Sequence, residues 1–196
     1  MANIVVFHSV LGVREGVLEL SKYLEEHGHR VFCMDLYDGR SFNDMDEAFE
    51  FFNGIGIQGL MERTVSYTKE VPGDAFYIGF SNGGASALLL SGTKPGAKGC
   101  VMLHAALPIH ALGIEKWPAT VPVEVHYAKA DPWKEEEEIK AFEDDINGSG
   151  ASYQYFEYPV KGHLFTDPLL PEYHKESADL LLKRVLKFVE DNEVRT

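Results

Sequence analysis

Apolar residues in this chain gather into short, nearly continuous runs, separated by longer stretches in which apolar and polar residues alternate with helical spacing. The short runs are rich in β-branched and aromatic residues and predict six strands, at 3–8, 30–35, 75–80, 99–104, 123–129 and 152–158. Most of these runs are apolar at successive positions. This pattern is typical of strands in a parallel sheet that is covered on both faces.

The stretches between the strands predict helices at 14–27, 44–52, 59–70, 83–91, 134–147 and 172–191. Each parallel strand pair needs a crossover, so the alternation of strand and helix predicts an α/β fold. We expect an open, mainly parallel sheet of about six strands, with helices on both faces and no large lid. The segment 105–121 has two prolines and little helical periodicity, and it is either a loop over a cleft or a long crossover.

Composition narrows the class of protein. A chain of 196 residues, 45% of them hydrophobic, is long enough for one core, and we expect a single domain over residues 1–196. The formal net charge of −13 argues against binding to nucleic acid or to anionic membranes. The start of the chain, MANIVVFH, lacks the features of a signal peptide, and no apolar stretch is long enough to span a bilayer. We therefore expect a cytoplasmic protein, and nothing in the sequence indicates its oligomeric state.

Two cysteines and an acidic run are poor candidates for metal sites. Cys33 and Cys100 lie inside apolar runs, where a thiol behaves as a small buried hydrophobic group, so neither a disulfide nor a zinc site is expected. The run KEEEEIK at 134–140 places glutamates at the start of a predicted helix, where they interact favourably with the helix dipole.

The sequence GIGIQG at 54–59 matches the glycine pattern of dinucleotide-binding proteins. That pattern works only directly after a strand, whereas this copy follows DEAFEFFN, which has helical spacing. We interpret it as a glycine-rich connection between two helices. A nucleotide-binding protein remains a rival hypothesis.

The sequence GFSNG, Gly79 to Gly83, matches G-x-S-x-G between an apolar strand and a helix rich in Ala and Leu. In that setting the serine lies on a sharp turn at the carboxyl edge of the sheet, and small neighbours allow strand and helix to pack closely. Ser81 is therefore the candidate nucleophile.

A serine hydroxyl needs a positioned base, and the base needs a carboxylate. Asp131 follows the strand at 123–129, and His163 follows the strand at 152–158. We expect both at the same sheet edge as Ser81, with Asp35 and Asp167 as alternatives for the acid. The order Ser, Asp, His is that of α/β-hydrolases.

The oxyanion hole needs two N–H donors. We expect one from the backbone of Asn82 and the second from Val10 or Ser9, in the loop after the first strand. His104, at a carboxyl strand end, is a candidate for lining the pocket, with a place in the core as the default. The aromatic residues Trp133, Phe165 and, in the 105–121 segment, Trp117 could line the pocket or equally belong to the core.

Over nearly its whole length the sequence resembles the dienelactone hydrolase family of α/β-hydrolases. GFSNGG resembles the family's G-x-C-x-G-G elbow, MDLYDG its D-L-Y segment, KADPW the region of its aspartate, and GHLF its G-H-x-F. Three positions depart from the family pattern: Ser81 stands for the usual cysteine, Ser9 for a glutamate and Asp167 for an arginine. The missing arginine removes one partner for a substrate carboxylate.

Together these observations predict a serine hydrolase that cleaves a small ester, lactone or thioester through an acyl-enzyme on Ser81, without a metal or an organic cofactor. The alternative is a non-catalytic small-molecule-binding protein that retains the hydrolase fold, because a fold by itself does not establish chemistry.

Overall fold

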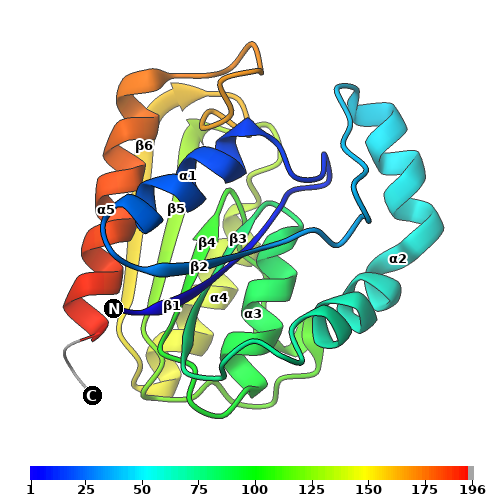
Figure 1. The fold of residues 1–196 in the computed structure, drawn as a ribbon. Coiled ribbons are helices and arrows are strands. Elements are labelled where there is room, and N and C mark those ends of the chain that lie inside the picture. The colour runs from blue at the N-terminus through cyan, green and yellow to red at the C-terminus, as the bar shows by residue number, and fades with distance from the viewer. Residues whose placement is uncertain (194–196) are drawn as a thin grey trace.

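The computed structural model describes residues 1–193 and contains one six-stranded sheet, with strand order β2-β1-β3-β4-β5-β6 and every neighbouring pair parallel (Figure 1). The strands are β1 (Asn3–Phe7), β2 (Arg30–Met34), β3 (Ala75–Phe80), β4 (Gly99–Leu103), β5 (Val123–Ala130) and β6 (Tyr153–Lys161). All six predicted strands are confirmed, and so is the parallel α/β sheet.

Helices cover both faces of this sheet. They are α1 (Glu15–Glu26), α2 (Met45–Tyr67), α3 (Gly83–Thr93), α4 (Glu136–Ser149) and α5 (Lys175–Glu193), with a short 3-10 helix, η1 (Ile109–Leu112). One layer holds α1 and α5, and the other holds α2, α3 and α4 (Figure 1).

Side chains of the strands alternate between the two layers, as the two-residue period of a strand requires. In β1, Ile4 and Val6 pack with residues of α1 and α5, whereas Val5 and Phe7 pack on the opposite side. All four side chains are fully buried. The continuous apolar run at the start of the chain therefore reflects a strand with no solvent-facing side.

The helix α2 consists of two helices that meet at a kink. Two helices joined by a glycine-rich connection at 54–59 were expected, and this is confirmed, but the connection is shorter than expected because only Gly56 departs from helical geometry, at φ 68° and ψ 168°. The chain bends there, so that α2 has two arms (Figure 1). Glycine alone adopts such angles without strain, which explains how one residue suffices for the bend. The GIGIQG pattern thus lies within a helix and not in a turn between strand and helix.

The segment 105–121 packs as a crossover. Ile114 and Trp117 are buried, and the indole N–H of Trp117 donates to the carbonyl of Val121 at 2.8 Å. A Cβ atom added at Gly92 of α3 would lie 2.7 Å from Ile114, so the segment contacts this helix closely. The segment covers the α3 side of the core, and of the two alternatives for Trp117, pocket lining and core, the core alternative holds.

In the part of the chain that the structure describes, no helix combines the length and hydropathy required to cross a bilayer.

We predict that Trp117→Ala lowers the free energy of unfolding by about 3–5 kcal/mol, because it leaves a large cavity and removes a buried hydrogen bond. Urea denaturation measures this change. Unchanged stability together with an altered KM for an ester substrate would contradict the crossover role.

Candidate active site

Ser81 lies in the sharp turn between β3 and α3 with φ at 51°, a left-handed conformation that residues other than glycine seldom adopt. Its N–H donates to the carbonyl of Leu103 at 2.7 Å, and its carbonyl accepts from the N–H of Gly84 at 2.8 Å. Backbone contacts on both sides therefore hold the strained conformation in place.

The neighbouring glycines make this turn possible. A Cβ atom at Gly79 would lie 2.2 Å from the carbonyl oxygen of Gly83, and one at Gly83 would lie 2.3 Å from the carbonyl oxygen of His8. Side chains at either position would push α3 away from β3 or β1. Glycine is thus required by close approach of backbone to backbone.

The three residues expected to form a triad are hydrogen-bonded in series. His163 Nε2 lies 2.7 Å from Ser81 Oγ, and His163 Nδ1 lies 2.7 Å from Asp131 Oδ2. The second carboxylate oxygen of Asp131 accepts from the backbone N–H of Trp133 at 2.9 Å. With its proton on Nδ1, the imidazole donates to Asp131 and accepts from the serine hydroxyl.

The fold brings these residues together because each follows the carboxyl end of a parallel strand. Ser81 follows β3, Asp131 follows β5, and His163 follows β6 after Gly162. Gly162 has φ of 90°, which turns the chain back toward the serine. Of the alternative acids, Asp35 accepts from the N–H groups of Tyr37 and Gly39, away from His163.

The loop after β1 holds the second group of expected donors. Ser9 and Val10 are buried, and Ser9 fixes the loop by accepting from Gly12 through its carbonyl and from Leu11 through its hydroxyl. The backbone N–H groups of Ser9, Val10 and Asn82 donate no hydrogen bond to any of the described residues. The start of this loop, at His8, lies against Gly83, so these N–H groups border the serine turn.

His8 anchors the same loop and was not singled out by the sequence analysis. Its Nδ1–H donates to the carbonyl of Ser9 at 2.7 Å, and its Nε2 accepts from the N–H of Leu36 at 3.0 Å. Burial lowers the pKa of His8, which favours this neutral form. Its position directly after the first predicted strand could have identified His8 from the sequence.

A cleft of about 450 Å³ opens beside His163. Its lining comes from four segments of the chain and comprises Asn43, Asp44, Met45, Asp46, Pro132, Trp133, Gly162, His163, Leu164, Leu170, Pro171 and Glu172. The centre of the Trp133 ring lies 4.5 Å from that of His163, and 42% of Trp133 is exposed. Trp133 therefore lies where it was expected, at the wall of the cleft.

His104 and Phe165 do not line this cleft. Both are buried, with ring centres 4.9 Å apart, and the His104 ring lies 5.8 Å from that of His163. His104 Nε2 contacts the hydroxyl of Thr166 at 3.2 Å, while its Nδ1 has no hydrogen-bond partner among the described residues. They form packing behind the imidazole of His163, so the possible lining role is not found and the core alternative holds for both residues.

Asp167, at the position of the family's arginine, is neutralised by a residue that the sequence analysis did not identify. Arg14 is 8% exposed, and its Nε donates to Asp167 Oδ2 at 2.6 Å. The same guanidinium donates to the carbonyl of Phe42 and to the side chain of Asn43, both at 2.7 Å. Arg14 thus ties the loop after His163 to the start of α1 and to one wall of the cleft.

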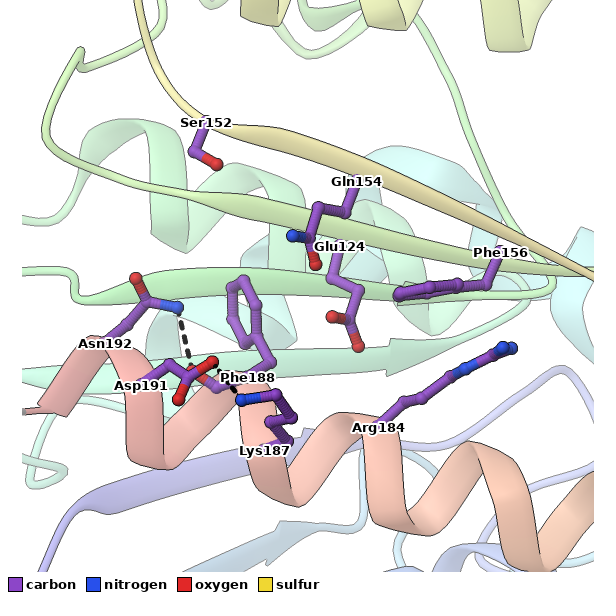
Figure 2. Close-up of a pocket in the computed structure, with 9 residues that line it drawn as sticks. All are labelled: Glu124, Ser152, Gln154, Phe156, Arg184, Lys187, Phe188, Asp191 and Asn192. Atoms are coloured by element: carbon purple, nitrogen blue, oxygen red, sulfur yellow. Dashed lines mark hydrogen bonds and ion pairs between the residues drawn. The ribbon is translucent and has the colours of Figure 1, made fainter.

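A second pocket, of about 240 Å³, lies at the other end of the sheet (Figure 2). It is formed by the amino ends of β5 and β6 and by the last turns of α5, and includes Glu124, Gln154 and Arg184. The Glu124 carboxylate is already bound to His126 at 2.7 Å. Ser81 and His163 take no part in this pocket. No group of metal-ligating side chains was found within residues 1–193.

The parallel sheet, the strained serine between strand and helix, and the chain order of Ser81, Asp131 and His163 define the α/β-hydrolase fold. The chain belongs to the dienelactone hydrolase family, whose model matches residues 1–192. It is accordingly a hydrolase that acts on ester bonds.

Similar proteins are distant in sequence. A Yersinia pestis protein named "Putative carboxymethylenebutenolidase" is 22% identical over 201 residues, which covers 93% of this chain and 75% of the relative. An Escherichia coli K12 protein of the same name is 21% identical over 204 residues, with 94% and 75% covered.

Two solved structures show the same fold. A dienelactone hydrolase-like promiscuous phosphotriesterase from metagenomic libraries has a TM-score of 0.79 at 23% identity, with 98% of this chain and 87% of that chain covered. The dienelactone hydrolase of Anabaena variabilis has a TM-score of 0.64 at 15% identity, with 98% and 87% covered.

We predict that Arg14→Met destabilises the protein by about 3–5 kcal/mol, because the Asp167 carboxylate is left buried without a counter-charge. The double variant Arg14→Met/Asp167→Asn removes both charges and should recover part of this loss. A double-mutant cycle by urea denaturation measures the coupling. Strictly additive effects of the two substitutions would show that the ion pair contributes nothing.

A second prediction concerns pH. Burial holds the pKa of His104 well below its usual range, so the unfolded chain binds a proton below about pH 6.5 while the folded protein does not. The free energy of unfolding should therefore decline as the pH is lowered from 6.5 to 5.5. Asparagine tolerates the positive φ of this position and does not titrate, so His104→Asn should make the slope shallower by up to about 1.4 kcal/mol per pH unit. Urea denaturation at each pH measures the free energy of unfolding of both proteins. Equal slopes of this free energy against pH would contradict the role of His104.

Proposed function

We propose that this protein is a serine hydrolase that cleaves a small ester, lactone or thioester through an acyl-enzyme on Ser81. The observation that carries the proposal is the hydrogen-bonded series Ser81, His163, Asp131, with both bonds at 2.7 Å. A serine, a base and an orienting carboxylate at these distances are the requirements for nucleophilic catalysis by a hydroxyl group.

In the first step Ser81 Oγ attacks the carbonyl carbon of the substrate, and the hydroxyl proton passes to His163 Nε2. The carbonyl oxygen becomes an oxyanion, stabilised by the N–H of Asn82 and by that of Val10 or Ser9. The bond from the carbonyl carbon to the leaving oxygen or sulfur then breaks, and His163 returns the proton to that atom. Asp131 holds the imidazole with its proton on Nδ1 and stabilises its charged form.

The second step repeats this chemistry with water. Water loses a proton to His163 Nε2 and its oxygen bonds to the acyl carbon, after which the bond to Ser81 Oγ breaks and the serine regains a proton. The products are a carboxylic acid and free enzyme. The route uses this chain's own side chains and backbone N–H groups, together with water.

We predict that Ser81→Ala and His163→Ala each lower kcat by at least about 10³-fold and leave the fold intact. Asp131→Asn should also be severely impaired, because the asparagine no longer fixes the tautomer of His163. Initial rates on small acyl esters test the three variants, with circular dichroism as the control for folding. Full activity of Ser81→Ala would refute the proposal.

Covalent labelling tests the nucleophile without a known substrate. A small fluorophosphonate should add once to the wild-type protein and not to Ser81→Ala or His163→Ala, as measured by intact mass. A folded wild-type protein that neither reacts nor hydrolyses any acyl ester would favour the non-catalytic binding protein instead.

A further inference from the structure

The walls of the cleft beside His163 carry charge of only one sign. Three carboxylates line the cleft, those of Asp44, Asp46 and Glu172, whereas its lining includes no lysine or arginine. None of the three forms an ion pair within residues 1–193. A charged group entering the cleft therefore meets negative charge that no ion pair offsets. Asp44 and Asp46 lie at the start of α2, whose dipole stabilises carboxylates in their ionised form.

These carboxylates are held beside the reacting groups by the backbone. The stem of Glu172 lies against Gly162, where an added Cβ atom would be 2.3 Å from Glu172 Cβ, and Gly162 directly precedes His163. Asp44 caps α2 by accepting from the N–H groups of Asp46 and Glu47. That cap fixes the Asp44 carboxylate and the backbone at Asp46, which both line the cleft.

The nearest guanidinium does not compensate this charge. Arg14 contacts Asn43 at the edge of the cleft, but its charge is matched by Asp167 at 2.6 Å and its side chain is buried. Lys161 belongs to an adjoining groove that shares Glu172 with the cleft, and it does not line the cleft itself.

An aromatic surface accompanies the acidic walls. Trp133 is 42% exposed, and its ring centre lies 4.5 Å from that of His163 and 5.6 Å from that of Phe49, which is itself partly exposed. The face of an indole attracts organic cations, and carboxylates add to that attraction. A quaternary ammonium or a protonated amine fits this combination, whereas a carboxylate group is repelled.

We propose that this cleft selects cationic esters over neutral ones and rejects anionic ones, with Asp46, Glu172 and Trp133 as the residues that set the preference. The proposal rests on the proposed function, since it takes Ser81 and His163 as the hydrolytic groups. In this proposal the part of the substrate that lies in the cleft carries a positive charge, and this part is separate from the ester bond that is cleaved.

The test compares nitrophenyl esters that share a leaving group and differ in acyl charge. The cation is a trimethylammonio-butanoate, the neutral control is its tert-butyl isostere, and the anion is a hemiglutarate. We expect kcat/KM to fall in that order, with the cationic ester favoured over the anionic one by about tenfold or more at low salt. Added salt should reduce the ratio, because it screens partly exposed charges.

The double variant Asp46→Asn/Glu172→Gln should reduce the ratio of cationic to anionic kcat/KM by about tenfold. The variant Trp133→Leu should lower the same ratio by reducing kcat/KM for the cationic ester. The matched control is Glu25→Gln/Glu190→Gln. It removes two exposed carboxylates at the far ends of α1 and α5, and should leave the ratio unchanged. Using a ratio of two esters corrects for any general loss of activity in a variant.

Each outcome has one meaning. No fluorophosphonate adduct and no ester hydrolysis would overturn the proposed function. If the protein is labelled and hydrolyses the cationic, neutral and anionic esters at equal rates, or prefers the anionic ester, the charge selection is overturned and the proposed function is not. A ratio that falls equally in the control variant would assign the preference to the net charge of the whole molecule and overturn the role of the cleft.

Discussion

The close approach of backbone to backbone around Gly79 and Gly83 is the constraint on which the rest of this structure depends. The start of α3 contacts the carbonyl of His8 at the end of β1, and no side chain fits between them. This contact places Ser81 above the sheet edge and places the loop after β1 beside it. Ser81 and the backbone N–H groups of that loop thus have a fixed relation to each other, which is the preorganisation that the proposed acyl transfer requires.

Electrostatics divides the surroundings of Ser81 into two regions. Behind His163, burial keeps His104 neutral, and Arg14 cancels the charge of Asp167. In front of His163, the carboxylates of the cleft remain unpaired. The core side of His163 is therefore neutral while the cleft beside it is negative, and the proposed selection of cationic esters depends on this difference.

The sequence predicted the strands and the candidate triad because both depend on local patterns. Continuous apolar runs predict covered strands, and polar residues directly after such runs meet at one edge of a parallel sheet. The position of Ser81 followed from its neighbours alone, because a tight turn from strand to helix needs glycine two residues before and two residues after the serine.

Contacts between distant segments were beyond such reasoning. Arg14 and Asp167 are 153 positions apart, and only the packing of the start of α1 against the loop after His163 brings them together. His104 was a lining candidate because it adjoins a strand end, and Phe165 because it is near the triad, with core as the alternative for both. The sequence does not tell whether such a side chain points into the core or toward the pocket. The bend at Gly56 was misjudged in extent, because a glycine-rich segment with good helix formers around it continues the helix on either side.

The bend at Gly56 also divides α2 into two arms with different contacts. Beyond Gly56, α2 is fixed to the body of the protein, where Leu60 and Thr64 are buried and the hydroxyl of Thr64 lies 2.7 Å from that of Ser86 on α3. Before it, the other arm lines the cleft only at its start, through Met45 and Asp46. Its Ala48 is buried against Val10, Leu11 and Leu164. A larger side chain at Ala48 would therefore disturb the loops that carry Val10 and His163, whereas a substitution at the exposed Asp46 changes the wall of the cleft. The first turn of α2 is thus the part of this helix in which the cleft can change while the packing beside His163 is kept.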